Sequence, residues 1–126
     1  MYTFGKTSTA RLDTCHQDLQ DIMNDLIKVM DVTIIQGWRT PEQHAEYLRK
    51  GHSTVPYERS KHSSKPSRAV DVAPYPIDWD DIQRFKDMIN VIKGSAAARG
   101  IDIRCGGDWK SFKDYPHIEL VGREWN

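Results

Sequence analysis

The stretch SKHSSKPSRAVDVAPYP, Ser60 to Pro76, joins a polar loop to a short run rich in valine. Its AVDVA segment predicts a strand between turn-forming residues. Because successive side chains of a strand point to opposite faces, Val70 and Val72 should face the core while Asp71 shares the other face with two alanines. A carboxylate there needs a partner, since an unpaired buried charge is costly. An arginine, backbone amides or a metal ion would each serve.

The residues before this strand predict two helices and a strand. Residues 11–30 carry apolar side chains every three or four positions, which predicts one amphipathic helix. Val32 to Gln36, VTIIQ, predicts a strand. Thr40, Pro41 and Gln43 fit the cap and first turn of a helix from about Pro41 to Lys50, ended by Gly51. Residues 51–67 form a predicted long loop, and loops of this length are often functional.

The residues after the strand complete an α+β pattern. Asp78 or Asp80 is expected to cap a helix that runs to about Arg99, with Gly94 as a candidate break and Gly100 as its end. Segments 101–105 and 117–121 predict two further strands, separated by a GGDW turn. This order predicts an α+β fold class: helices packed on one side of a small, mostly antiparallel sheet.

Length and composition predict one soluble domain over residues 1–126. The chain is 38% hydrophobic and 29% charged. Lys and Arg together number 18, as do Asp and Glu, so the formal net charge is zero. Since capture of nucleic acid needs a basic surplus or stripe, we expect no nucleic-acid partner. Cys15 and Cys105 lie far apart and form no CxxC motif, so we expect reduced thiols in or near the core.

Membrane insertion and secretion are not expected. No apolar run approaches the length of a transmembrane helix. The N-terminal MYTFGKTSTARLD lacks a charged region followed by an apolar one, so it does not resemble a signal peptide. These patterns suit a chain made in a cytoplasm.

Two of the five histidines stand in a context that suggests a metal site. His62 precedes Asp71 by nine positions, and His117 follows Asp114 by three. Pro116 excludes a regular helix, so Asp114 and His117 are expected on a tight turn that enters a strand. Two histidines and one aspartate, with a fourth position open for water, suit a catalytic zinc ion, and Asp114 could then accept a proton. Spacing alone leaves this as one hypothesis, because such dispersed ligands form no local motif.

With these residues identified, the chain resembles the superfamily of zinc D-Ala-D-Ala peptidases and L-alanyl-D-glutamate endopeptidases. Its usual signature is SxHxxGxAxD, followed by E/D-x-x-H. The first part is matched by Ser60, His62, Ala69 and Asp71, and the second by Asp114 and His117.

The resemblance extends over about residues 4 to 121. GWRTPEQ is similar to the family's early arginine segment, and AVDVAPYPIDW, GGDW and PHIEL are similar to the phage-type branch. The chain departs from the signature in one place: nine positions separate His62 from Asp71 instead of seven, and Ser67 stands where the glycine would be. Loops absorb such insertions cheaply. The departure bears on His62, for which His52 is the fallback ligand.

The resemblance implies a Hedgehog/DD-peptidase-like fold and a role for each matched residue. It implies that Zn2+ is held by His62, Asp71 and His117, that Asp114 is the general base, and that Arg39 stabilises the oxyanion at the substrate. Ser60 would hydrogen-bond substrate. A surface salt bridge for Arg39 and a turn cap for Ser60 are the structural alternatives. We further expect Glu119 either in a supporting position or as a strand-edge residue, and Trp109 and Tyr115 in either the peptide groove or the core.

The function implied by the resemblance is a zinc metallopeptidase that cleaves the stem peptide of bacterial peptidoglycan. The preferred form is an L-alanyl-D-glutamate endopeptidase, as in a phage or prophage lysin. One alternative is a D-Ala-D-Ala carboxypeptidase or dipeptidase. Another is an inactive zinc-binding cell-wall or virion structural module, although such a module needs neither Asp114 nor Arg39. We expect a monomer, made in the host cytoplasm, that acts on the cell wall after release.

Overall fold

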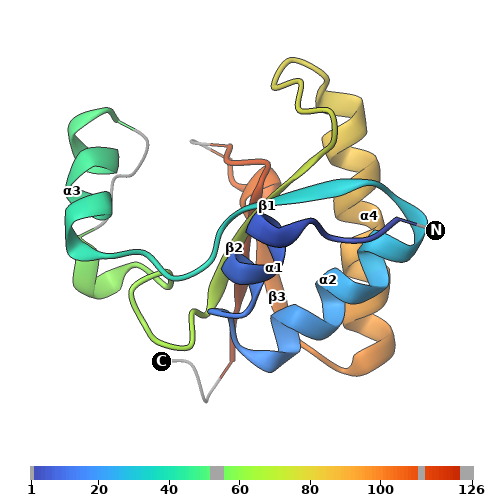
Figure 1. Cartoon of the computed structure of the whole chain (residues 1–126), viewed down its shortest axis with the longest axis horizontal. Helices are drawn as coiled ribbons and strands as arrows, with labels where there is room; N and C mark the ends of the chain where they lie inside the picture. The colour runs from blue at the N-terminus through green and yellow to red at the C-terminus, as the bar shows by residue number, and fades with distance from the viewer. Residues whose placement is uncertain (1, 52–55, 111–112, 123–126) are drawn as a thin grey trace.

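An antiparallel sheet forms the centre of the molecule, as a computed structural model shows (Figure 1). The structure describes residues 2–51, 56–110 and 113–122. Within these ranges the sheet has four strands in the order β1-β2-β4-β3. Their bounds are Val32–Gln36 for β1, Ala69–Pro74 for β2, His117–Leu120 for β4 and Ile103–Cys105 for β3. The predicted antiparallel sheet is therefore confirmed, with β3 shorter than the expected strand.

Helices α2 (Gln17–Val29) and α4 (Ile82–Arg99) lie together beside the sheet, whereas α3 (Pro41–Arg49) lies apart from them, at the left of Figure 1. The short α1 (Lys6–Leu12) packs against β1. Two single 3-10 turns, η1 (Tyr57–Arg59) and η2 (Gly106–Asp108), interrupt the connections. The fold class is thus α+β, as predicted. None of the described helices has the length and apolar character needed to cross a membrane.

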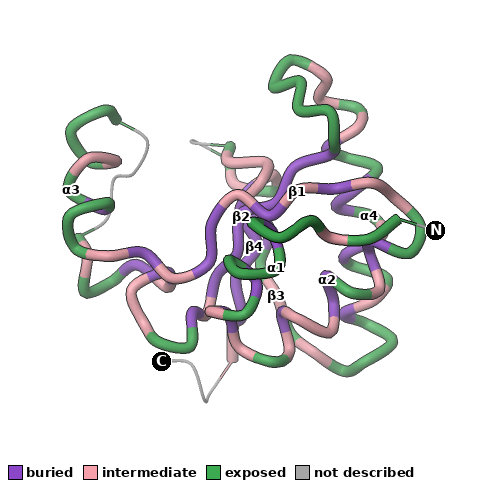
Figure 2. The backbone as a smooth tube through the Cα atoms, viewed as in Figure 1, coloured by how far each residue is buried: buried purple, intermediate pink, exposed green. Residues whose placement is uncertain are grey.

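The hydrophobic core fills the space between α2, α4 and the sheet, where Figure 2 shows buried backbone in all three. Val70 and Val72 lie in it, as strand alternation predicted. All six residues of β2 are buried, so the face that carries Asp71 is covered as well. Both cysteines are buried, as expected, and neither forms a disulfide.

The single helix predicted over residues 11–30 is wrong, because the chain breaks between α1 and α2. The Thr14 hydroxyl donates to the Arg11 carbonyl at 2.6 Å, and Cys15 forms an isolated bridge with Ser67. His16 then caps α2 by accepting a hydrogen bond from the Asp18 amide at 3.0 Å. Leu12 and Cys15 therefore reach the core from either side of a turn, although they lie on the same apolar stripe.

Of the other predicted helix boundaries, the start of α3 and the end of α4 are confirmed, whereas the predicted cap of α4 is wrong. Thr40 and Gln43 form a capping box at the start of α3, as predicted. Asp81 caps α4, so neither Asp78 nor Asp80 has that role; the Asp78 carboxylate instead accepts from the amide of residue 80. Gly94 lies inside α4 without breaking it, and Gly100 ends the helix with a φ of 69°. Glycine suits that left-handed position because it has no Cβ.

Candidate functional site

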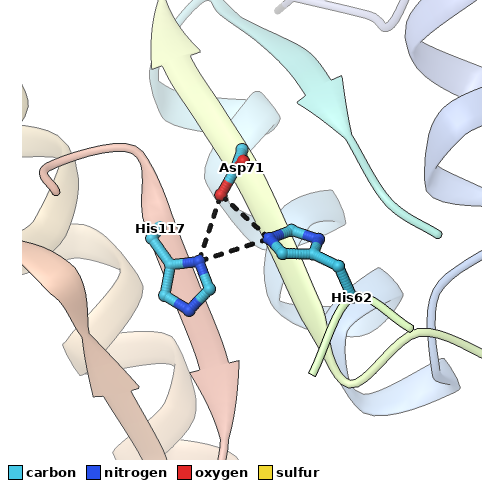
Figure 3. A group of neighbouring side chains, drawn as sticks. All are labelled: His62, Asp71 and His117. Atoms are coloured by element: carbon cyan, nitrogen blue, oxygen red, sulfur yellow. Dashed lines mark hydrogen bonds and ion pairs between the residues drawn. The ribbon is translucent and has the colours of Figure 1, made fainter. Parts of the chain in front are cut away.

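The side chains of His62, Asp71 and His117 converge on one point beside the sheet (Figure 3). Asp71 Oδ1 lies 3.2 Å from His117 Nδ1 and 3.3 Å from His62 Nε2, and the two ring nitrogens are 3.3 Å apart. All three residues are buried, and one ligand atom from each lies within 4.8 Å of the others. Two nitrogens and one oxygen in this arrangement could hold a metal ion.

Strand pairing determines where two of the three ligands lie. Asp71 on β2 and His117 on β4 are cross-strand partners in the register of the sheet. Side chains directly opposite each other on one face of an antiparallel pair are close neighbours. The backbone alone therefore brings an aspartate and a histidine together, although they are 46 positions apart in sequence.

The longer loop still delivers His62 to this point. His62 Nδ1 lies 2.8 Å from the Gly37 carbonyl oxygen. Since a carbonyl only accepts, Nδ1 carries the proton and Nε2 presents a lone pair. The loop is anchored by hydrogen bonds from the Ser67 amide to the Thr14 carbonyl and from the Arg68 amide to the Lys61 carbonyl. The two extra residues therefore do not keep His62 from Asp71. The fallback ligand, His52, lies outside the described residues.

His117 is held by a carboxylate on its outer side. Its Nε2 lies 2.8 Å from Glu119 Oε1, so Nε2 donates and Nδ1 faces the other two ligands. Glu119 also pairs with Lys61 at 3.3 Å. Burial lowers the pKa of His117, but the hydrogen bonds to Asp71 and Glu119 outweigh it and raise the pKa to about 9. His117 thus readily takes up a proton and becomes positively charged. A metal ion would take the place of that proton. The expected supporting position of Glu119 is confirmed.

Asp71 is ionised in this setting. Burial disfavours the charged form, yet the charges and hydrogen bonds of His62 and His117 hold the pKa of Asp71 well below its usual range. Its other oxygen, Oδ2, lies 3.7 Å from Nη2 of Arg39. Asp71 therefore has one of the partners that its sequence left open, a buried arginine, and it also contacts two histidines that could hold a metal ion with it.

Arg39 is buried and held by several side chains, unlike an arginine in a surface salt bridge. Only 5% of it is exposed. Its Nε donates to Gln36 Oε1 at 2.9 Å, and Nη1 lies 3.1 Å from His44 Nδ1, which must accept because a guanidinium only donates. Its guanidinium carbon lies 4.2 Å from the ring centre of Tyr47, within cation–π range. These contacts fix the guanidinium beside Asp71.

Asp114 lines a cavity of about 470 Å³ that also reaches Asp71 and Arg39. Burial, and next to it the charge of Asp71, raise the pKa of the Asp114 carboxyl above its ordinary value. The Asp114 carbonyl accepts from the His117 amide at 3.0 Å, which forms the predicted tight turn into β4. The aromatic wall of the cavity includes Tyr115. Such a carboxylate beside a candidate metal point can exchange protons with a group in the cavity.

Two further residues from the sequence predictions are placed near the site. The Ser60 hydroxyl accepts from the His62 amide at 3.3 Å and is buried, which is the geometry of a turn cap. Its predicted contact with substrate stays a prediction. The Trp109 ring lies 5.2 Å from that of His117.

Sequence patterns missed Gln36 and His44, the two residues that hold Arg39. His44 is fully buried and lies in the helix that was predicted from Pro41. Its interaction with Arg39 spans five positions across the start of α3, a spacing that belongs to no helical periodicity. The only available signal was the predicted helix start at Thr40, which places the first turn of α3 next to Arg39.

Comparisons with known proteins identify a family. The family model of the phage L-alanyl-D-glutamate peptidase matches residues 1–121. The L-alanyl-D-glutamate peptidase of Escherichia phage T5 is 33% identical over 95% of this chain and 98% of its own. The peptidoglycan L-alanyl-D-glutamate endopeptidase CwlK of Bacillus subtilis (strain 168) is 31% identical over 75% of this chain and 63% of its own.

A solved structure is similar along nearly the whole chain. The crystal structure of the L-Ala D-Glu endopeptidase ChiX of Serratia marcescens superimposes with a TM-score of 0.83 at 27% identity, over 97% of this chain and 92% of that one. These matches lead to one assignment. The chain belongs to the phage L-alanyl-D-glutamate peptidase family.

Proposed function

We propose that the protein is a zinc endopeptidase that hydrolyses the bond between L-alanine and D-glutamate in the stem peptide of bacterial peptidoglycan. The observation that supports this most directly is the convergence of His62, Asp71 and His117 next to the cavity that Asp114 and Arg39 line. The names of its relatives give the bond and the polymer.

The metal would be held by His62 Nε2, Asp71 Oδ1 and His117 Nδ1. Zinc suits this donor set, since catalytic zinc sites use three protein ligands of this kind and leave one position open. A bound zinc ion lowers the pKa of a coordinated water toward ~7 and polarises the carbonyl of the substrate.

Asp114 would move the proton during hydrolysis. As the water oxygen attacks the alanine carbonyl carbon, Asp114 accepts the water's proton. When the C–N bond breaks, Asp114 returns that proton to the nitrogen of D-glutamate, which leaves as an amine. A carboxyl pKa above the ordinary value suits a group that has to act as base and then as acid.

Arg39 would stabilise the negative charge that develops on the carbonyl oxygen. Its guanidinium is fixed by Gln36 and His44, so little reorganisation is needed when that charge appears. Loss of one such donor typically costs ~100-fold or more in rate. A structural zinc module would have no use for a buried arginine and a base beside the metal.

Digestion of purified murein tests this proposal. The zinc-loaded protein should release fragments with new N-terminal D-glutamate, identified by mass spectrometry. Asp114→Asn should bind the same amount of zinc and release at least ~100-fold less product. Asp102→Asn, which removes an exposed carboxylate elsewhere, is the matched control and should cut normally.

Other products would identify the alternatives. Released D-alanine would instead indicate a D-Ala-D-Ala carboxypeptidase. Intact murein in the presence of wild-type protein with bound zinc would indicate the binding module.

A further inference from the structure

We propose that Lys113 binds the free carboxylate of the D-glutamate residue and makes the enzyme select a carboxylate over a carboxamide at that position. This inference rests on the proposed function, and it adds a residue that determines which form of the stem peptide is cleaved. Four features support it. Lys113 lines the cavity, it has no acidic partner, Arg39 has a separate role, and Asp114 is next to Lys113 in sequence.

Lys113 lines the same cavity as Asp71 and Asp114. Its ammonium group donates to two backbone carbonyls, those of Gly107 at 3.3 Å and Trp109 at 3.2 Å. These two bonds orient the side chain but do not neutralise it. An ammonium has three donors, so one N–H remains for a ligand.

In the described part of the chain, Lys113 forms no ion pair with any carboxylate. Among the lysines of the described residues, only Lys61 and Lys93 pair with an acidic residue, at 3.3 Å and 2.8 Å. Lys113 is exposed and differs from the other unpaired lysines in that it lines this cavity. Lys113 thus presents an unneutralised charge at the wall of the cavity. A ligand that supplies a carboxylate there would gain a charge-assisted hydrogen bond.

Arg39, the other cation of the cavity wall, is held beside Asp71 and is assigned to the carbonyl oxygen in the proposed mechanism. It faces Asp71 at 3.7 Å and donates to Gln36 and His44. Any further anion has to be neutralised by Lys113, because Asp71 and Asp114 would repel it.

The chemistry of the substrate places a carboxylate on this side of the cavity. Glutamate has two carboxyl groups, and the peptide continues through only one of them. In a peptide that continues through the γ-carboxyl, the free α-carboxylate is attached to the carbon that bears the nitrogen released when the alanyl bond breaks. Asp114 would protonate that nitrogen, so the free carboxylate comes close to the residue that carries the proton. Lys113 is its immediate neighbour in sequence and lines the same cavity.

Two synthetic peptides test the inference. One is N-acetyl-L-alanyl-γ-D-glutamyl-L-lysine with a free α-carboxylate, and the other carries an α-carboxamide instead. The zinc-loaded wild type should cleave the carboxylate form with about 5- to 20-fold higher kcat/KM. Lys113→Gln should remove most of this preference through a higher KM for the carboxylate peptide, with kcat little changed, because the contact serves binding before and during the reaction. Lys113→Arg should keep the preference.

A matched control and a second readout make the test specific. Lys110→Gln removes the same charge from an exposed lysine that does not line the cavity, and it should behave as the wild type does. The inhibition constant of the product γ-D-glutamyl-L-lysine should rise in Lys113→Gln by the same factor as KM.

Two failures can be told apart. Equal cleavage of both peptides by the wild type, or an unchanged preference in Lys113→Gln, would overturn the role of Lys113 and leave the proposed function standing. Cleavage of neither peptide would overturn the proposed function and this inference with it.

Discussion

At the scale of single residues, both histidines of the candidate metal site are held by a hydrogen bond on the side away from the other two side chains. His62 donates to the Gly37 carbonyl, and His117 donates to Glu119. Each bond selects the tautomer whose free nitrogen faces Asp71. The ligand atoms are therefore oriented before any ion arrives, which lowers the entropic cost of binding it.

Glu119→Gln should weaken metal binding by about 10- to 100-fold while the protein stays folded. The amide can still accept from His117 Nε2, but it lacks the charge that makes the imidazole a better ligand. The measurement is competition with a chelator of known zinc affinity. Glu46→Gln, on the outer face of α3, is the control and should bind zinc as the wild type does. Equal affinities in both variants would show that Glu119 serves Lys61 alone.

The sequence identified the three converging side chains better than the residues around them. Alternation in AVDVA isolated Asp71, and the KDYPH turn paired Asp114 with His117, because both patterns are local. Gln36 and His44 were not found, since their contact with Arg39 depends on how β1 turns into α3. Neither residue type stands out until that turn is known.

At the scale of secondary-structure elements, Gly37 forms a close contact between the end of β1 and the turn after α1. A Cβ on Gly37 would overlap Thr14 Oγ1, and it would lie 2.5 Å from the Arg11 carbonyl oxygen and 2.9 Å from Cys15 Sγ. The same residue supplies the carbonyl that orients His62. The close packing of the Gly37 backbone against the turn after α1 therefore links the packing of α1 to the candidate metal site.

Gly37→Ala should lower the free energy of unfolding by several kcal/mol and reduce zinc affinity, because the displaced backbone carries the His62 partner with it. Gly94→Ala is the matched control. Its Cβ would meet nothing within 4 Å inside α4, so the change should stabilise the protein by roughly 0.5–1 kcal/mol. Urea denaturation measures both. A Gly37→Ala protein as stable as the wild type would contradict the close contact.

Helix and strand boundaries were predictable where local signals decide them. The capping box of α3 and the glycine that ends α4 follow from residue type at a helix end. The break between α1 and α2 does not, because Cys15 leaves the helix to pair with Ser67, 52 positions later. An apolar stripe continues across such a break unchanged, so periodicity cannot reveal it.

At the scale of the whole molecule, the metal centre joins three separate segments: β2, β4 and the loop that carries His62. An ion bound there favours the folded chain, since the unfolded chain has no formed site. The sheet and the site should therefore be stabilised together.

Zinc at ~100 times its dissociation constant should stabilise the fold by about 2.7 kcal/mol and raise the Tm by several degrees. Asp71→Asn should lose most of that increase, because the amide replaces a charged ligand with a neutral one. Asp102→Asn should keep it. Scanning calorimetry with and without a chelator measures the shift. If zinc left the Tm of the wild type unchanged, the three side chains would not form one site.

Because cross-strand pairing brings Asp71 and His117 together, metal binding also reports whether the sheet has assembled in the correct register. A slip of one residue between β2 and β4 would turn one of the two side chains to the opposite face and separate the ligands. Misregistered chains, however compact, would be unable to retain the ion. During refolding, the moment at which zinc becomes resistant to a chelator would therefore mark correct alignment of the two central strands, and a spectroscopically active substitute such as cobalt would make that alignment visible.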